Sequence, residues 1–383
     1  YSSSINEDHG ASGADDSESV GEGGGLSALR SSSSSSGSSS LPPRIVVLGG
    51  GFGGLYSALK LCELNWQQPM QTQPRGGPAG GGITPGITLI DQSDRFLFKP
   101  LMYELVSGEA TLDQVAPLFR DLIGTSPVRF VQGEVENVEL ASTEDGLAGR
   151  IFLSDGSHLD YDYLVLGVGA EVNLDLVPGA REFALPFGSL DDVRKLEKTL
   201  TVREDRQLQT RVAVVGGGAG GVELAAVVSE RLRSTIGEAK ASVRLYVAGN
   251  EVMEDFAPDA RKVAIETLKE KGVEVVFGSR VEEVAKKEVQ EEEDNSIYTL
   301  KIKNINMAAA AASEDAGATE GNADESSGLI DVETDVILWT AGAKPVEVSG
   351  IKIPGNQNRN SVTIDPTLKI QGRTQEFAIG DVA

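Results

Sequence analysis

Two glycine-rich turns, each directly after a short run of aliphatic residues, constrain this chain more than any other feature. The first is Arg44-Ile-Val-Val-Leu-Gly-Gly-Gly-Phe-Gly-Gly54, and the second is Arg211-Val-Ala-Val-Val-Gly-Gly-Gly-Ala-Gly-Gly221. A β-strand, a glycine turn and a helix in that order form the unit that binds the diphosphate of a dinucleotide. Two such units predict two dinucleotides held side by side, which is what moving electrons from one to the other requires.

In the first turn, Gly49, Gly51 and Gly54 match the spacing G-x-G-x-x-G. The glycines allow a tight turn, a close approach of backbone to pyrophosphate, and close packing of helix on strand. Asp91 follows the next predicted strand, Ile87–Ile90, and is positioned to bind ribose hydroxyls. It lies further along the chain than the usual ~20 residues, because a Pro/Gly-rich insertion over 67–86, expected to be an exposed loop, intervenes.

The second turn repeats the motif at Gly216, Gly218 and Gly221. Here the predicted strand Val243–Val247 is followed by Ala248 and Gly249, so no carboxylate stands at the expected ribose position. A 2′-phosphate would then meet no fixed negative charge. We therefore expect this site to accept NADPH at least as well as NADH.

The formal net charge of -24 argues against nucleic-acid binding and against simple electrostatic attachment to an anionic membrane. The single cysteine, Cys62, excludes a structural disulfide, a cysteine metal cluster and a CxxC redox pair. We expect no metal site. No apolar run reaches the length of a membrane span.

The ends of the chain carry little structure-forming information. Residues 1–41 are rich in serine, glycine and acid, and we expect them to be disordered. A remnant of an organelle-targeting segment is the alternative, although the acidic residues count against it. Because the chain begins at Tyr1 and stops at Ala383, directly after a motif, we expect a fragment whose membrane-binding or substrate-binding C-terminal part is missing.

Between these ends the pattern predicts alternating strands and helices. The expected segments include helices at Gly53–Leu64 and Pro258–Lys271, strands at Val128–Val131, Val135–Leu140, Ile151–Leu153, Tyr163–Gly169, Val273–Phe277 and Val336–Gly342, and a last strand and turn at Phe377–Ala383. A low-complexity acidic insertion, 307–328, interrupts what we expect to be a hairpin between Tyr298–Ile302 and Val332–Leu338.

The two turns, together with the strand ends Gly167-Val-Gly-Ala170 and Gly380-Asp381, resemble the two-dinucleotide-binding-domain flavoproteins of the glutathione reductase type. The resemblance implies an α/β fold in which an NAD(P)H Rossmann domain is inserted into an FAD Rossmann domain. The FAD domain would cover 44–180 and return at 346–383, with the NAD(P)H domain at 186–345. It also implies that Asp381 binds the ribityl or pyrophosphate part of FAD.

Disulfide reductases and sulfide:quinone oxidoreductases need more cysteines than this chain has. What remains is direct hydride transfer to flavin and onward transfer to a quinone, oxygen or a protein carrier. Several segments are similar to type II NAD(P)H:quinone dehydrogenases, which are non-electrogenic, and Gln92-Ser-Asp94 with Phe98-Lys-Pro100 is most similar to their plastid C-type, demethylphylloquinone-reductase-like branch. These segments are Asp91–Gly108, Ala116–Arg120, Tyr161–Val165 and Trp339–Gly342.

By that resemblance Lys99 and Pro100 approach the flavin ring, and Glu223 lies near the nicotinamide, which makes Lys99 and Glu223 the candidate catalytic residues. Glu223 has an alternative, structural role at the positive end of its helix, where it is expected at the third position. Tyr103 and Glu104 are expected to be core and cap residues. The other predicted cofactor-binding residues are Phe52, Gly53, Val135, Gly169, Ala219, Gly220, Ala341 and Gly342.

The resemblance implies an FAD-dependent enzyme that passes electrons from NAD(P)H to a membrane quinone of the plastoquinone or demethylphylloquinone type. It implies peripheral membrane contact at a thylakoid or plastoglobule surface in a plastid, with the mitochondrial inner membrane as the alternative, and a homodimer is among the expected assemblies. Two other functions stay open. One is an oxidoreductase with a protein carrier such as ferredoxin, or one like apoptosis-inducing factor; the other is a flavin redox sensor or scaffold without turnover.

Overall fold

The computed structural model describes residues 42–64, 66, 85–142, 147–287, 296–304, 329–351 and 361–383. Residues Pro42–Ala383 form one compact unit. The segment 1–41, the insertion 307–328 and most of the predicted loop 67–86 lie outside the described residues. Within the described part of the chain, no helix has both the length and the apolar character needed to cross a membrane.

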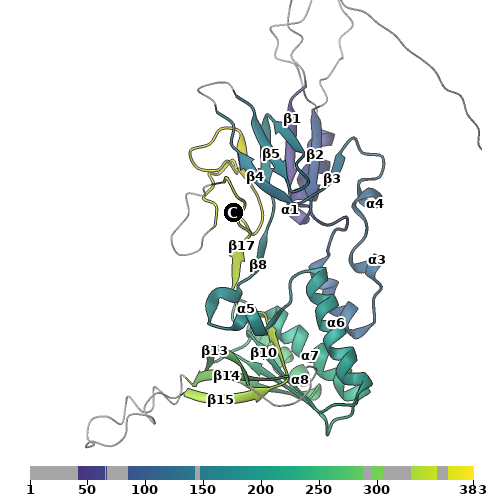
Figure 1. The fold of residues 1–383 in the computed structure, drawn as a ribbon, viewed down its shortest axis with the longest axis vertical. Helices are drawn as coiled ribbons and strands as arrows, with labels where there is room; N and C mark the ends of the chain where they lie inside the picture. The colour runs from purple at the N-terminus through teal and green to yellow at the C-terminus, as the bar shows by residue number, and fades with distance from the viewer. Residues whose placement is uncertain are drawn as a thin grey trace, which may run out of the picture. The chain divides into compact units, whose positions relative to one another are not determined.

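The first glycine turn follows the central strand of a five-stranded parallel sheet with the order β18-β7-β1-β2-β3. Figure 1 labels β1, β2 and β3 of this sheet. Its strands are β1 (Arg44–Leu48), β2 (Gly86–Asp91), β3 (Arg129–Gln132), β7 (Tyr163–Leu166) and β18 (Glu376–Ala378). Alternate residues of β1 face opposite cores: Ile45 and Val47 pack with helix α1 (Phe52–Glu63), and Val46 and Leu48 face the other side. Burial on both faces explains the continuous apolar run in the sequence.

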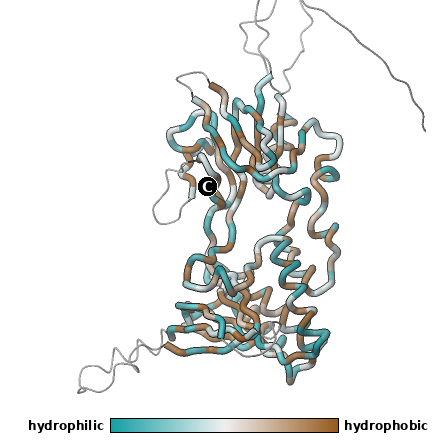
Figure 2. Tube along the Cα trace, viewed as in Figure 1, coloured by the Kyte–Doolittle hydropathy of each residue, from teal (hydrophilic) through white to brown (hydrophobic). Residues whose placement is uncertain are grey.

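The second glycine turn follows the central strand of another five-stranded parallel sheet, with the order β12-β11-β10-β16-β9. Its strands are β9 (Leu185–Pro186), β10 (Thr210–Val215), β11 (Ala241–Tyr246), β12 (Val273–Val276) and β16 (Val336–Trp339). Three helices share one core with this sheet, namely α6 (Leu190–Asp205), α7 (Ala219–Thr235) and α8 (Pro258–Glu270). Apolar stretches run through the strands of both sheets (Figure 2).

Each parallel sheet is accompanied by a three-stranded antiparallel sheet. The strands are β4 (Val135–Glu139), β5 (Gly149–Leu153) and β6 (His158–Tyr161) in the first unit, and β13 (Ser279–Lys287), β14 (Ile297–Asn304) and β15 (Leu329–Thr334) in the second. This antiparallel sheet lies in sequence between β3 and β7 in the first unit and between β12 and β16 in the second, so in each unit it follows the central strand and the next two parallel strands. The fold therefore contains an internal repeat.

One predicted element is wrong. The run Val332–Leu338 is not one strand of a hairpin, because residues up to Thr334 pair with β14 while Val336 onward joins β10 in the parallel sheet. Arg211 fixes the point where the chain passes from the antiparallel sheet to the parallel sheet. Its backbone C=O accepts the Thr334 hydroxyl at 2.9 Å, and its N–H donates to Asp335 at 2.7 Å.

An equivalent arginine–aspartate interaction is present in the first unit. Asp162, just before β7, accepts the backbone N–H of Arg44 at 2.7 Å and its guanidinium at 2.9 Å. Asp335 accepts the Arg211 guanidinium at 2.8 Å. Arg44 is the first residue of β1 and Arg211 is the second residue of β10, so the repeat includes an arginine–aspartate ion pair near the start of each central strand.

The second sheet lies in sequence between β7 and β18 of the first. The connections leave through β8 (Ala170–Val172) and return through β17 (Ala343–Pro345), and these two strands pair antiparallel. The remaining short elements are η2 (Lys99–Leu101), α2 (Met102–Ser107), α3 (Leu112–Val115), α4 (Phe119–Ile123), η3 (Leu174–Leu176) and α5 (Ala180–Phe183).

Candidate active site at two glycine turns

The first glycine turn shapes an open cradle at the start of α1. Gly49 has φ +91°, and a Cβ atom there would lie 2.5 Å from the carbonyl oxygen of Gly167, so only glycine fits. A Cβ at Gly54 would overlap the carbonyl oxygen of Gly49, which shows how closely helix and strand pack. By contrast, a Cβ at Gly51, the N-cap residue of α1, would meet nothing within 4 Å. No side chain caps this helix end, so its N–H groups suit a pyrophosphate.

Asp91, at the end of β2, turns its carboxylate toward this turn. It accepts the N–H of Gly50 at 2.6 Å and the N–H of Ser93 at 2.8 Å. Burial raises the pKa of Asp91, although both hydrogen bonds oppose that shift. Asp91 lines a cavity of about 250 Å³ with Gly49 and Val135. Three residues predicted from separate segments thus border one cavity.

Other predicted residues surround the same helix end. The ring of Phe52 meets the ring of Phe98 edge-on, with centroids 5.4 Å apart. A Cβ at Gly53 would lie 3.2 Å from Ile379, two residues before Asp381. Asp381 itself is exposed. The contact at Ile379 brings the predicted Gly-Asp segment to the beginning of α1.

The side chain of Lys99 reaches the start of β8, where the connection from β7 ends. Its Nζ donates to the carbonyl oxygen of Ala170 at 3.5 Å, next to Gly169, which has φ +73°. Pro100 follows Lys99 in η2, and η2 leads directly into α2. The structure therefore places Lys99 at the strand end formed by Gly169 and Ala170, with Pro100 next to it in the chain.

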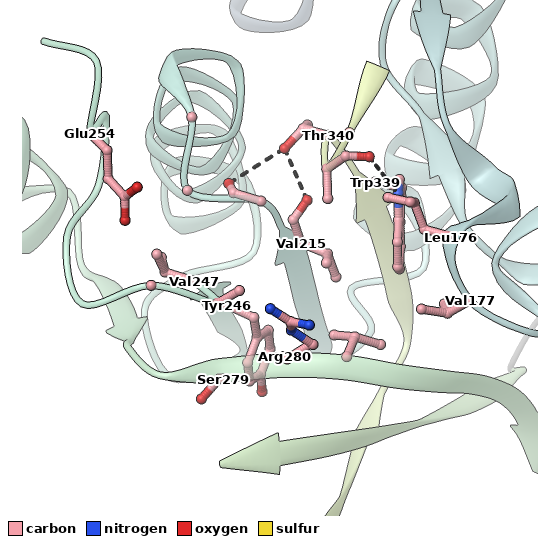
Figure 3. Close-up of a pocket in the computed structure, with 18 of the residues that line it drawn as sticks. Leu176, Val177, Val215, Tyr246, Val247, Glu254, Ser279, Arg280, Trp339 and Thr340 are labelled. Atoms are coloured by element: carbon pink, nitrogen blue, oxygen red, sulfur yellow. Dashed lines mark hydrogen bonds between the residues drawn. The ribbon is translucent and has the colours of Figure 1, made fainter. Parts of the chain in front are cut away.

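The second glycine turn repeats the geometry of the first. Gly216 has φ +123°, and a Cβ at Gly221 would overlap the carbonyl oxygen of Gly216. Gly218 is the uncapped N-cap residue of α7, and a Cβ there would meet nothing within 4 Å. Thr340 fixes the turn by donating its hydroxyl to the carbonyl oxygen of Val215 at 3.0 Å (Figure 3). The turn opens on a cavity of about 600 Å³. The predicted residues that line it are Gly216, Gly218, Ala341 and Gly342; Ala219, Gly220 and Gly221 form the first turn of α7.

Backbone hydrogen bonds identify which residue of the second unit corresponds to Asp91. In each unit the first glycine of the turn donates its N–H to the carbonyl oxygen of a residue on the neighbouring strand, which is Ile90 on β2 and Tyr246 on β11. The registers agree, since these residues pair with the last residues of β1 and β10. The next residue is Asp91 in one unit and Val247 in the other.

The predicted placement of this position at Ala248 or Gly249 is therefore wrong, because the residue that directly follows Tyr246, the counterpart of Ile90, is Val247. A Cβ at Gly217 would lie 2.6 Å from the Val247 side chain. In the first unit, the equivalent contact is the hydrogen bond from the second glycine of the turn to Asp91. An apolar contact thus replaces a polar one, and the strand end supplies no carboxylate.

Sequence reasoning missed that carboxylates enter this cavity from further along the chain. Glu251, Glu254 and Asp255 all line it. The Glu254 Oε1 atom fills the space that a Cβ on Gly249 would need. No local pattern marks Glu254 for this role, because its position depends on how the loop after β11 folds back.

Helix α2 links the first site to the second. It packs against α6 and α7, and Met102 and Val106 belong to the core of the second sheet. The Tyr103 hydroxyl lies 2.9 Å from the Cβ position of Gly220. Burial, and then the neighbouring Glu223 carboxylate, raise the pKa of Tyr103 to about 12. The phenol therefore stays neutral at physiological pH beside the second glycine turn.

Glu223 is the fifth residue of α7, not the third, and no acidic residue lies in the first turn of that helix. A structural role for the Glu223 carboxylate at the positive N-terminal end of α7 is therefore less favoured, because that interaction is strongest within the first turn. Its side chain is exposed, yet partial desolvation raises its pKa.

Tyr103 packs against Phe187 with ring centroids 5.1 Å apart, as a core residue would. Glu104 lies in the first turn of α2, whose N-cap residue is Leu101, so Glu104 is not the cap.

Comparison with known proteins gives matches over the whole described region. The family described as pyridine nucleotide-disulphide oxidoreductase matches residues 43–383. Among curated proteins, the chain is 32% identical over 348 residues to the alternative NAD(P)H-ubiquinone oxidoreductase C1, chloroplastic/mitochondrial, of Arabidopsis thaliana, covering 87% of this chain and 60% of that protein. It is 31% identical over 342 residues to demethylphylloquinone reductase NdbB of Synechocystis, covering 88% and 70%.

Among solved structures, NDH2 from Plasmodium falciparum in complex with NADH matches with a TM-score of 0.65 and 19% identity, covering 89% of this chain and 64% of that one. At that identity the likeness concerns the fold. The chain spans about 60% of the length of the Arabidopsis relative and 70% of the Synechocystis relative. Among the residues that the structure describes, no group of His, Cys, Asp and Glu side chains is arranged to hold a metal ion.

Proposed function

The chain belongs to the pyridine nucleotide-disulphide oxidoreductase family, and on that premise we propose that it is the FAD- and NAD(P)H-binding part of a type II NAD(P)H:quinone dehydrogenase. In this proposal residues 44–180 and 346–383 bind FAD, and residues 186–345 bind NAD(P)H. The acceptor is a membrane quinone of the plastoquinone or demethylphylloquinone type. The names of the Arabidopsis and Synechocystis relatives support that choice.

The connection from Lys99 to Tyr103 is the observation that carries the proposal. Lys99 touches the Gly169-Ala170 strand end of the first unit, and Tyr103, one helical turn further on, lies beside Gly220 and Glu223 of the second. A segment of five residues therefore connects the Gly169-Ala170 strand end of the first unit to the second glycine turn. Electron transfer between two bound dinucleotides needs this kind of fixed, short separation.

The residues of the first unit fit FAD. The space at Gly51 and the uncapped start of α1 would receive the pyrophosphate, and the Asp91 carboxylate would bind the ribose. Asp381 would face the ribityl or pyrophosphate part. When bound, FAD supplies two-electron chemistry, accepting hydride from NAD(P)H and passing electrons on to the quinone.

The side chains of this chain would mainly position the reactants. Lys99 and Pro100 would border the flavin ring, and Glu223 would face the nicotinamide. Because hydride transfer needs no proton from the protein, Lys99 and Glu223 would act by orienting and by local charge. With a single cysteine, residues 1–383 do not supply a redox dithiol, despite the name of the family.

Charge also favours a quinone over an acidic protein carrier. The net charge of -24 would repel a carrier such as ferredoxin, whereas a neutral quinone is not repelled.

We place the protein at a plastid membrane surface, with peripheral contact and the mitochondrial inner membrane as the alternative. The chloroplastic/mitochondrial and cyanobacterial relatives support this placement. We also propose a homodimer, which size measurement in solution would test.

Anaerobic flavin bleaching tests the proposed function. The chain, reconstituted with FAD, is mixed with NADH or NADPH and followed near about 450 nm, where oxidised flavin absorbs. We expect loss of this absorbance, and its return when menadione or a plastoquinone analogue is added. Absence of bleaching would favour a redox sensor without turnover. Bleaching that a quinone cannot reverse would favour a protein acceptor.

A further inference from the structure

The cavity at the second glycine turn contains a carboxylate, although the end of β11 supplies none. This carboxylate belongs to Glu254, in the loop that follows β11. We propose that Glu254 is the residue that discriminates between the two nicotinamide nucleotides, and that it does so by disfavouring a 2′-phosphate, so that the site selects NADH over NADPH. This inference rests on the proposed function, because it concerns the nucleotide of that same site. It reverses the preference expected from the sequence.

The internal repeat locates where the adenosine ribose would lie. The ribose-binding acid of the first unit is Asp91, whose carboxylate meets the second glycine of the turn. Val247 holds the same place in the second unit. The ribose of a nucleotide on Gly216–Gly218 would therefore lie against Val247 and the two residues that follow it.

The loop after β11 is fixed so that Glu254 covers this place. The N–H of Met253 donates to the carbonyl oxygen of Gly217 at 2.7 Å, and Met253 has φ +51°. At the other end, Gly249 accepts the N–H of Gly278 at 2.9 Å. Between these anchors the Glu254 Oε1 atom packs over Gly249, two residues beyond Val247.

The charges around the cavity leave Glu254 uncompensated. Glu251 forms an ion pair with Arg261, whereas Glu254 forms no ion pair with any residue in the described part of the chain. Arg280 also lines the cavity, but it comes from β13, on a different wall from the loop that carries Glu254 (Figure 3). A 2′-phosphate next to Glu254 would meet like charge, whereas a 2′-hydroxyl could donate a hydrogen bond to it.

Binding of flavin-independent probes tests the role of Glu254. We would measure dissociation constants of ADP-ribose and of its 2′-phosphate by calorimetry, for the wild type, Glu254→Gln and Glu270→Gln. We expect the wild type to bind ADP-ribose about tenfold more tightly, and Glu254→Gln to remove most of that difference. Since Glu254 is exposed, the difference should also shrink as salt is raised.

Glu270→Gln is the matched control, because it removes the same charge from α8 at a residue that does not line the cavity. It should keep the wild-type discrimination. Equal binding of both probes by the wild type, or the same ratio in Glu254→Gln as in Glu270→Gln, would overturn the inference. These outcomes can be distinguished from a failure of the proposed function. Bleaching by NADH and NADPH with equal efficiency would leave the proposed function intact and refute the role of Glu254. Discrimination between the two probes without flavin bleaching would support the role of Glu254 and count against the proposed function.

Discussion

Replacing Gly218 with alanine should separate nucleotide binding from folding. Gly218 has φ -71° and ψ 175°, which alanine adopts freely, and its Cβ position meets nothing within 4 Å. The substitution therefore introduces no clash in the ligand-free protein. Because alanine restricts the unfolded chain, the free energy of unfolding should stay unchanged or rise by about 0.4–1 kcal/mol.

The nucleotide meets a different situation, because the open space at Gly218 is where the pyrophosphate would approach the backbone. Forcing a methyl group into a filled site costs about 1–3 kcal/mol. Losing one hydrogen bond to a charged group costs about 1.5–3 kcal/mol. Either cost alone weakens binding roughly 10- to 100-fold. We expect the nucleotide concentration for half-maximal bleaching to rise by that factor, with FAD content unchanged.

Two further alanine variants calibrate this experiment. Gly86→Ala, at the start of β2, also meets nothing within 4 Å but lies outside both cavities, so it should change neither binding nor stability appreciably. Gly221→Ala would overlap the carbonyl oxygen of Gly216, so its melting temperature should fall. The reasoning is refuted if Gly218→Ala melts as early as Gly221→Ala, or if it binds the nucleotide as the wild type does.

Three other substitutions probe the first site and the nicotinamide. Gly51→Ala should weaken FAD about 10-fold or more without lowering the melting temperature, by the same argument as for Gly218; unchanged FAD retention on a desalting column would contradict it. Burial raises the folded-state pKa of Asp91, so its charge destabilises the ligand-free fold at neutral pH, and this penalty disappears as the pH falls below the unperturbed value of 3.8. Asp91→Asn should therefore be at least as stable as the wild type in denaturant at pH ~7, with the gap closing in acid, while retaining less FAD; a wild type that is clearly more stable at neutral pH would count against this. Glu223→Gln should slow flavin reduction about tenfold, the value of one hydrogen bond, in a stopped-flow measurement, and an unaltered rate would remove Glu223 from the nicotinamide site.

The sequence alone was sufficient for features that depend on local chemistry. The glycine spacing located both turns, because Gly49 and Gly216 need positive φ and the last glycine of each turn needs close contact with the first. Asp91 was found for the same reason, since an acid directly after an apolar strand is visible in the sequence. These features depend on few residues, and a short sequence pattern marks each of them.

Features that depend on distant residues were not predictable. The break after Thr334 depends on hydrogen bonds to Arg211, far earlier in the sequence, and nothing in the run Val332–Leu338 indicates it. The position of Glu254 depends on the Met253 N–H reaching Gly217. In both cases the deciding partner is a backbone group, and a backbone group leaves no trace in the side-chain pattern.

The internal repeat also explains how the two sites could come to differ. Both turns have the same glycine contacts, and each central strand has near its start an arginine held by an aspartate. The position held by Asp91 in one unit and Val247 in the other is free of these constraints. Asp91 accepts a hydrogen bond there and Val247 makes an apolar contact, yet both turns keep the same form. Ligand choice at that position is therefore separated from folding. A carboxylate lost from it can be replaced from the adjoining loop, as at Glu254, without altering the strand, turn or helix that hold the pyrophosphate.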